Sequence, residues 1–300
     1  KGPSRLDTAQ HEGNPGDTMV GQLLGFKPQT PPIFGVPTDG YQFANKRLGW
    51  ETVAPFVAVN SPLRTSHMRD PLGPQLTFAS ESFMDECAFA AGADPVEYRV
   101  RHLDKAKNAR DIGVLKAAAD KAGWKTGPHG ARRGRNGDVM TGMGIAYAQR
   151  SGGFAAAVAD VEVNQKTGKV WVKRVVIAQD IGLIVNPGTL KNVTEGNVLQ
   201  AISRTVKEEL TFNRQNVTSV DWATYPVLEI DDAPETVDVV FVENKNDKSS
   251  GAGEMGIRMV GAAVANAVFE ATGVRVRRAP LSPSNVRAGL AALETQEKKA

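Results

Sequence analysis

Residues 143–179 read as strand, turn and strand, and this pattern constrains the fold more than any other part of the sequence. Residues 155–163 alternate apolar and polar side chains, as a strand with one buried face does. The polar run at 164–169, Asn-Gln-Lys-Thr-Gly-Lys, predicts a hairpin loop. The mostly apolar residues 170–179 predict a returning strand that is buried on both faces, and residues 143–149 predict one more strand. Strands joined by a tight loop pair antiparallel, so a purely parallel sheet is excluded here.

Helices are expected on both sides of this strand region. We expect them at residues 76–91, from Asp94-Pro95, at 111–122, over about twenty residues after Asn186-Pro187, at 257–271 and at 284–293, with a further strand at 236–243. This order predicts an α+β fold with mixed or antiparallel sheets and packed helices. Residues 1–60 are rich in Gly and Pro and are expected to wrap over other protein. We divide the chain into residues 1–135, a wrapping segment and a helical part, and residues 136–300, a C-terminal α+β domain.

Charge and cysteine content limit the kinds of partner and metal site. A formal net charge of +3 is too small to indicate a nucleic-acid partner. Residues 99–135 hold eleven Lys and Arg against three Asp, which favours solvated helices and a flexible basic loop. A docking surface for an acidic partner or a cofactor phosphate is the alternative. The single cysteine, Cys87, cannot hold an iron–sulfur cluster alone, and its spacing predicts a buried position beside Ala79, Phe83 and Ala90. No apolar run reaches the roughly 18 residues of a membrane span.

A glycine-rich segment, Gly251-Ala252-Gly253-Glu254-Met255-Gly256, leads into the apolar residues 257–271 and is the strongest candidate for chemistry. Its glycines allow close approach of a bound group, and a helix start offers free N–H donors. The spacing matches G-x-G-x-x-G, but polar residues 244–250 precede it where a dinucleotide site needs a buried strand. Glu254 is placed to act as a general base. A carboxylate that only stabilises the helix dipole is the alternative, and the residues alone leave both open.

Two further polar clusters lie at residues 64–75 and 180–200. In the first, Arg69 offers a fork of donors for a phosphate or oxo group, although a structural loop would look the same. In the second, Asn186 is more typical of a turn or cap than of a ligand. The four histidines show no metal spacing among themselves or with Cys87, so we expect no metal held by protein ligands.

Three stretches together resemble the molybdenum-binding large subunit of the xanthine dehydrogenase/aldehyde oxidoreductase family, and within it the isoquinoline 1-oxidoreductase β-subunit type. The stretches are Pro62-Leu63-Arg64-Thr65-Ser66-His67-Met68-Arg69 with Gly73-Pro74-Gln75 and Glu81-Ser82-Phe83-Met84-Asp85-Glu86; Asp180-Ile181-Gly182 with Asn186-Pro187 and Glu195-Gly196-Asn197; and Gly251-Ala252-Gly253-Glu254 through Ala265-Asn266-Ala267 to Ala271-Thr272-Gly273-Val274-Arg275. The resemblance follows nearly the whole chain in order and identifies it as the C-terminal half of such a subunit.

The resemblance implies a molybdenum hydroxylase that oxidises an aldehyde or an N-heteroaromatic compound with water as the oxygen source. It implies Glu254 as the catalytic base, and Arg69, Gly251, Ala252 and Gly253 as contacts of a molybdenum–molybdopterin cofactor, with the cytosine dinucleotide form favoured. Electrons would leave through [2Fe-2S] clusters on a partner subunit, with a flavin or cytochrome c subunit as a further partner. The remaining half of the molybdenum subunit would complete the site. The compartment, bacterial cytoplasm or periplasm, stays open.

Departures from the family pattern keep a second hypothesis in view. Met255 stands where the family often has Pro or a small residue, and Val193-Thr194 stands where a cofactor-contacting glutamine is often seen. The family's glycine-glutamine-glycine loop is absent, and so is an initiator Met. We therefore expect a split subunit, a processed product or a fragment that binds no molybdenum cofactor alone. The alternative function is a non-catalytic structural or docking subunit of the same kind of complex.

Overall fold

The computed structural model describes residues 40–47 and 68–297. By its internal contacts the chain falls into two compact units. One comprises Lys1–Thr38, Asn45–Pro71 and Leu210–Tyr225, and the other comprises Asp39–Ala44, Leu72–Glu209 and Pro226–Ala300. All the helices and strands named below belong to the second unit. Most of the expected wrapping segment 1–60 lies outside the described residues, and the division at residue 135 stays a prediction.

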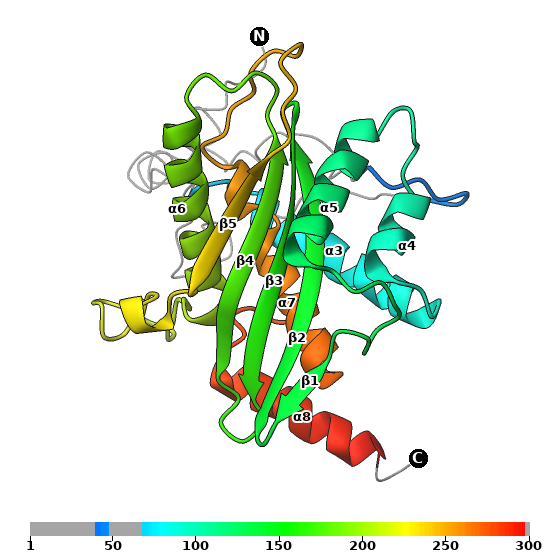
Figure 1. Ribbon diagram of the computed structural model, residues 1–300. Coiled ribbons are helices and arrows are strands. Elements are labelled where there is room, and N and C mark those ends of the chain that lie inside the picture. Colours follow the sequence, from blue (N-terminus) through cyan, green and yellow to red (C-terminus); the bar gives the residue numbers. More distant parts are fainter. Residues whose placement is uncertain (1–39, 48–67, 298–300) are drawn as a thin grey trace, which may run out of the picture. The chain divides into compact units, whose positions relative to one another are not determined.

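A five-stranded mixed sheet forms the centre of the second unit (Figure 1). Its strands are β1 (Gly134–Asn136), β2 (Val139–Arg150), β3 (Gly153–Asn164), β4 (Val170–Asp180) and β5 (Thr236–Phe241), side by side in that order. The first four pair antiparallel, and β5 pairs parallel to β4. The predicted α+β fold with a mixed sheet is therefore confirmed, and so are the strands expected around residues 143–179.

The turns of this sheet follow from local chemistry. Between β3 and β4, the side chain of Asn164 accepts hydrogen bonds from the backbone N–H groups of Lys166 and Thr167, at 3.0 and 2.9 Å. Gly168 closes this turn with φ +73°, a value that favours glycine. Between β2 and β3, Ser151 and Gly152 both have positive φ, as the tightest hairpin turns require.

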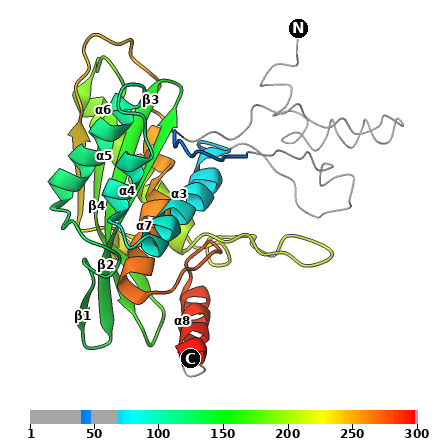
Figure 2. The same cartoon turned by 90° about the vertical axis from the view of Figure 1, so that its right-hand side faces the viewer.

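Helices cover both faces of the sheet, which explains why β3 and the second half of β4 are buried almost throughout. In Figure 2, α5 (Ala109–Ala122) and α7 (Val260–Thr272) lie on opposite sides of the sheet. Alternate residues of β2 divide between the two cores: Ile145 packs with the α5 side and Ala146 with the α7 side. α6 (Pro187–Val206) adds Val198 and Ile202 to the α7 core.

The helix ends confirm several signals read from the sequence. Asp94 caps α4 (Pro95–Arg101) by accepting hydrogen bonds from the N–H groups of Val96 and Glu97. Gly123 ends α5 with φ +72°, and Gly273 ends α7 with φ +75°. The last helix, α8, spans Pro283–Glu297. Within the described residues, no helix is both long and apolar enough to span a membrane.

The structure reverses the predicted orientation of α3 (Gly73–Ala90). Its buried positions include Thr77, Glu81, Ser82 and Asp85, whereas Phe83 is 64% exposed. Ala79 and Ala90 are exposed as well, and Cys87 is only half-buried. The prediction of a buried apolar side was wrong because ion pairs, and not apolar contacts, decide which face of this helix turns inward.

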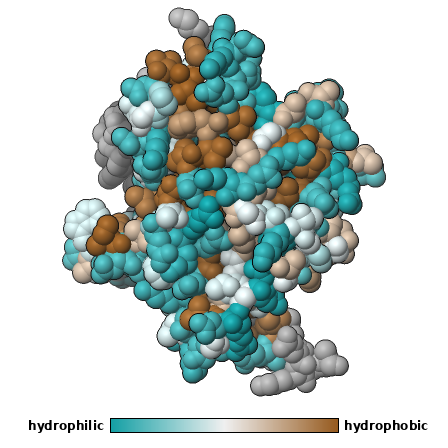
Figure 3. Space-filling model, viewed as in Figure 1, coloured by the Kyte–Doolittle hydropathy of each residue, from teal (hydrophilic) through white to brown (hydrophobic). Residues whose placement is uncertain are grey.

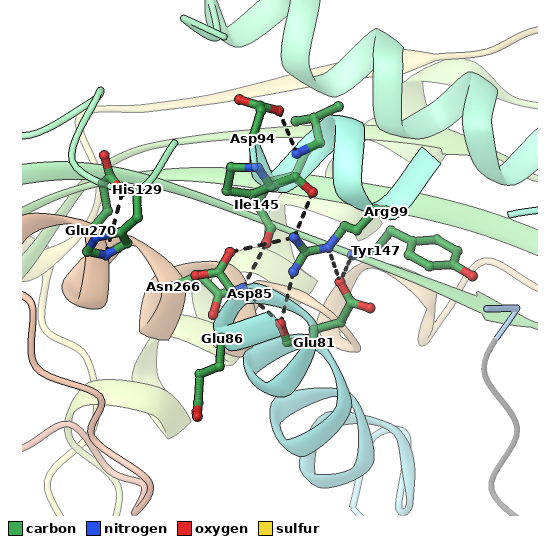
Figure 4. A network of polar contacts seen from close by, with 12 residues as sticks. Glu81, Asp85, Glu86, Asp94, Arg99, His129, Ile145, Tyr147, Asn266 and Glu270 are labelled. Carbon is green, nitrogen blue, oxygen red and sulfur yellow. Dashed lines mark hydrogen bonds and ion pairs between the residues drawn. The ribbon is translucent and has the colours of Figure 1, made fainter. Parts of the chain in front are cut away.

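The basic segment 99–135 is also more structural than its composition suggested. The fully buried Arg99 donates from Nε to Glu81 at 2.8 Å (Figure 4). Arg132 approaches Asp94 and Glu270 at 3.4 Å each, also with a buried side chain. The positive charges of these two arginines are therefore consumed inside the fold.

Candidate active site

The glycine-rich segment lies beyond the ends of β4 and β5, held by backbone contacts to the chain that follows β4. Ser250 N–H donates to the carbonyl of Ile181 at 2.8 Å, and Leu183 N–H donates to that of Asp247 at 3.0 Å. Gly182, with φ +73°, lies so close to Lys248 that a Cβ there would overlap its carbonyl oxygen. The two segments therefore run side by side and fix where the glycine-rich segment starts.

An ion-pair cluster clamps the base of this arrangement. Arg110, on α5, donates to Asp180 at 2.7 and 2.5 Å and pairs with Asp247 at 3.0 Å. Burial alone would raise the pKa of Asp180, but hydrogen bonds from Arg110 and from the N–H of Gly182 outweigh it and hold the pKa below its ordinary value. Asp180 is thus a charged structural anchor, and neither it nor Arg110 was expected in this role from the sequence.

Glu254 stands at the start of a short 3₁₀ helix, η3 (Met255–Ile257), and not at the start of α7. The expected helix 257–271 begins only at Val260, because a separate turn intervenes. The Glu254 carboxylate makes no cap hydrogen bond and is 30% exposed. It forms an ion pair with Arg150, the last residue of β2. A long helix dipole therefore does not hold this charge; a neighbouring guanidinium does.

Gly251 and Gly253 have no structural reason within the described chain to be glycine. A Cβ added at either position would meet nothing within 4 Å, and neither residue has a positive φ. Gly256 differs, because its added Cβ would lie 3.0 Å from the Cβ of Asn197 on α6. The first two glycines leave open space beside the loop, whereas the third is required by packing.

Buried polar atoms near the loop fit a site that is completed from outside. Ser250 Oγ, Asn197 Oδ1 and Gln179 Oε1 are buried with no hydrogen-bond partner among the described residues. Such atoms are costly unless something satisfies them. Together with the open space at Gly251 and Gly253, they fit a bound group that carries hydrogen-bond donors and acceptors. Met255, by contrast, is fully buried in the core, so its side chain serves packing.

The predicted site residues are only partly brought together. Gly251, Ala252, Gly253 and Glu254 form one continuous stretch of the second unit. Arg69 belongs to the other unit, so the structure does not relate it to Glu254. Its neighbour Asp70 has φ +51°, an uncommon value for a residue other than glycine. The loop residues 64–67 lie outside the described residues.

The second polar cluster is structural. Asn186 caps α6 by accepting a hydrogen bond from Thr189 N–H at 2.9 Å, as its turn-or-cap interpretation predicted. Glu195 pairs with Lys191 along the same helix at 3.7 Å. Asn197 donates to the carbonyl of Val193 at 2.8 Å.

Arg150 is the functional candidate that the sequence reasoning missed. It follows a strand and precedes a Ser-Gly-Gly turn, a context typical of any surface hairpin, so the sequence carried no signal for it. Its side chain is only 17% exposed and its partner is the candidate base. The described ranges contain no group of three or more His, Cys, Asp or Glu side chains that could hold a metal ion. A dinucleotide fold is also unsupported, because β5 ends at Phe241, before the polar segment 244–250.

At the same end of the molecule, hydrophobic side chains gather on the surface. Figure 3 shows them near the top of its view, where β4 ends and α6 begins. Leu183 is 45% exposed and Val185 is 82% exposed there. The candidate site therefore lies beside an open apolar rim.

Comparison with known proteins agrees with this geometry. A family model described as a molybdopterin cofactor-binding domain matches residues 89–234. One of the two subunits of nicotinate dehydrogenase from Pseudomonas putida is 37% identical over 93% of the chain. The β-subunit of isoquinoline 1-oxidoreductase from Brevundimonas diminuta is 29% identical over 70% of it. The chain spans about a quarter of the length of these two relatives, 24% and 26%.

A solved structure supports the fold. The aldehyde oxidoreductase of Desulfovibrio desulfuricans superposes with a TM-score of 0.65 at 14% identity, over 75% of this chain and 41% of the other. That the matched part is the C-terminal half of the subunit stays a prediction. The family expected from the three sequence stretches is confirmed: the chain belongs to the molybdopterin-binding large subunits of the xanthine dehydrogenase/aldehyde oxidoreductase family.

Proposed function

We propose that the chain forms part of the active site of a molybdenum hydroxylase and that Glu254 is its general base. The observation that carries the proposal is the glycine-rich segment itself: a partly exposed carboxylate, at the side of two glycines that the fold does not require. A purely structural carboxylate has no use for such open space. The oxidation would take an aldehyde or an N-heteroaromatic substrate and draw its oxygen from water.

The residues of this chain have separable tasks in that reaction. The backbone at Gly251, Ala252 and Gly253 would lie against the bound molybdenum–molybdopterin, since side chains there leave room for close approach. Arg69 would offer its guanidinium fork to the cofactor. When bound, the cofactor supplies the oxidised metal centre that accepts two electrons from the substrate.

Glu254 would hold and move a proton. Its carboxylate must be ionised at rest, and the adjacent Arg150 guanidinium favours the ionised form. The ion pair also fixes the direction of the carboxylate, so that a proton is taken at a defined oxygen atom. For the proton transfer itself, Arg150 must leave one carboxylate oxygen accessible. The 30% exposure of Glu254 agrees with that requirement.

Further parts of the enzyme belong to the same proposal. Names of the relatives cover nicotinate, isoquinoline and aldehyde substrates, which supports the substrate class. Because the chain spans about a quarter of its first relatives, the rest of the molybdenum subunit would close the site, and the isolated chain would bind no cofactor. Electrons would pass to [2Fe-2S] clusters on a separate subunit, and a flavin or cytochrome c subunit would follow. The cytosine dinucleotide form of the cofactor is favoured, and no nucleic-acid partner is expected.

A second candidate is a non-catalytic structural subunit of such a complex. The ion pair between Glu254 and Arg150 is the observation in its favour, since a structural carboxylate would make the same contact. The burial of Met255 in the core is equally compatible with it.

Analysis of the native complex that contains the chain separates the two candidates. We expect stoichiometric molybdenum, iron, and release of a pterin nucleotide, and we expect ¹⁸O from labelled water in the product of an aldehyde or N-heteroaromatic substrate. Full activity in a complex without molybdenum, or product oxygen that comes from dioxygen, would overturn the proposed function.

A further inference from the structure

The helix α3 is amphipathic in the reverse sense. Most helices at the surface of a protein bury apolar side chains and expose polar ones. Here the inward face includes Thr77, Glu81, Ser82 and Asp85, while Phe83 is 64% exposed. An exposed aromatic on an otherwise polar surface is ordinary, but a helix that is inverted along its length calls for an explanation.

Ion pairs fix this orientation. Glu81 accepts hydrogen bonds from Tyr41 Oη at 2.7 Å, from Arg99 Nε at 2.8 Å and from Tyr147 N–H at 3.1 Å (Figure 4). One helical turn further on, Asp85 accepts from Arg275 at 2.9 Å. Rotating α3 to hide Phe83 would break all of these contacts at buried positions. The polar contacts of the core therefore hold the outer face outward, and it cannot turn inward.

The outward apolar residues follow the spacing of a packing surface. We call them the α3 stripe: Leu76, Ala79, Phe83, Cys87 and Ala90. Steps of three and four residues keep these side chains on one side of a helix over four turns. Ala79, Phe83 and Ala90 are exposed, and Leu76 and Cys87 are half-buried. Small residues on either side of an aromatic are typical of a surface into which another element fits.

We infer that the α3 stripe is the surface on which the rest of the molybdenum-binding subunit, the part outside these 300 residues, packs against this chain. The occupant follows from length. The chain spans 24% and 26% of its two relatives, so about three quarters of such a subunit must find its place against this quarter. In sequence, α3 also begins four residues after Arg69, the proposed cofactor contact, so the polypeptide that closes the site must come near this part of the chain.

This inference rests on the proposed function, because it takes the missing part of the subunit as the occupant. A second copy of the chain, its own residues 1–39 or 48–67, and an iron–sulfur subunit are the competing occupants. Each predicts a different result in one labelling experiment.

Cys87 is a built-in probe, since it is the only cysteine of the chain and lies in the stripe. Its alkylation by N-ethylmaleimide is followed by peptide mass spectrometry in the 300-residue chain alone and in the native enzyme with the rest of the subunit. The urea-unfolded chain gives the intrinsic rate. We expect at least tenfold slower alkylation in the native enzyme than in the folded chain alone. A photoactivatable maleimide on Cys87 should cross-link to a peptide from the rest of the molybdenum subunit.

A pair of variants tests the same surface without the thiol. Phe83→Asp should leave the melting temperature of the chain alone unchanged, because the side chain is exposed, and should abolish its association with the rest of the subunit. Phe83→Leu, which keeps an apolar side chain, should retain association. The labelling and assembly readouts need neither molybdenum nor turnover, so they can succeed where the proposed function fails, and the reverse.

Equal alkylation rates in the chain and the native enzyme would overturn the inference. So would protection already present in the monomeric chain, which would assign the stripe to its own segments. Protection that appears only on dimerisation would assign it to a second copy, and a cross-link to the iron–sulfur subunit would assign it to that partner.

Discussion

Two carboxylates, Glu81 and Glu254, lie in sequence stretches that carry the same family resemblance, yet the structure treats them in opposite ways. The Glu81 side chain is 2% exposed and is satisfied by three hydrogen bonds from this chain. Glu254 is 30% exposed, and beside it lie glycines with open space and buried oxygens that lack partners in the described chain. The first region is closed by its own residues and the second is open to something else.

This difference separates structural from functional polar residues better than residue type does. Arg99, Asp85, Asn266 and Arg275 read in the sequence like site residues, but their hydrogen bonds point at one another and at backbone carbonyls. Burial raises the cost of an unpaired charge so far that such a network must be complete to exist. A binding site has the opposite requirement, because atoms that are already satisfied have nothing to offer a ligand.

The largest expected effect tests the open side of the comparison. In the assembled enzyme, Glu254→Gln should keep the fold and the cofactor but reduce turnover about 10²–10⁴-fold, the usual contribution of a general base. The amide keeps the shape of the side chain and cannot accept the proton. Steady-state kinetics at measured molybdenum occupancy checks this result.

Glu243→Gln is the matched control, since Glu243 is an exposed carboxylate paired with Lys245 at 3.0 Å and has no proposed role. Turnover of Glu254→Gln within about threefold of the wild type, at full molybdenum content, would remove Glu254 as the base. The non-catalytic alternative would then be favoured.

On the closed side, Arg99→Leu should destabilise the chain by about 3–5 kcal/mol, because Glu81 and Asp85 would stay buried without their cation. Urea unfolding measures the change. Arg101→Leu, at an exposed position of the same helix, should stay within about 0.5 kcal/mol of the wild type. If Arg99→Leu costs less than about 1 kcal/mol, the network is not closed in the sense described here.

A pair of glycines gives the smallest and sharpest contrast. A Cβ at Gly144 on β2 would overlap the backbone of α7 at Ala267, so Gly144→Ala should cost about 1–3 kcal/mol or more. Gly251→Ala meets nothing and should leave stability unchanged or raise it by up to about 1 kcal/mol. Thermal and urea unfolding of the two variants measure these changes.

In the assembled enzyme the order should reverse for function. Gly251→Ala should lower molybdenum and pterin content, because its methyl group occupies the space proposed for the cofactor. Normal cofactor retention in Gly251→Ala would show that the open space beside the loop is not part of the site.

Much of the fold could be predicted from the sequence because the signals were local. Alternation in 155–163, the Asn-to-Lys turn at 164–169, the Asp94-Pro95 cap and Gly123 each act over a few residues, and all were found in place. The family could also be identified from ordered motifs. Arg150 could not, because its role depends on Glu254, which lies 104 residues away in the chain.

By itself, then, the sequence determined the strands, most helices and their caps, the α+β class, and the glycine-rich segment with Glu254 as its one carboxylate. Only the tertiary structure decided which face of α3 is buried, that α7 starts after Glu254 and not beside it, and that Arg150 is the partner of that carboxylate. The physical reason is the range of the forces involved. Backbone hydrogen bonds and turns are set by neighbours in the chain, whereas the pairing of a buried charge depends on which distant residue the fold brings within about 4 Å of it.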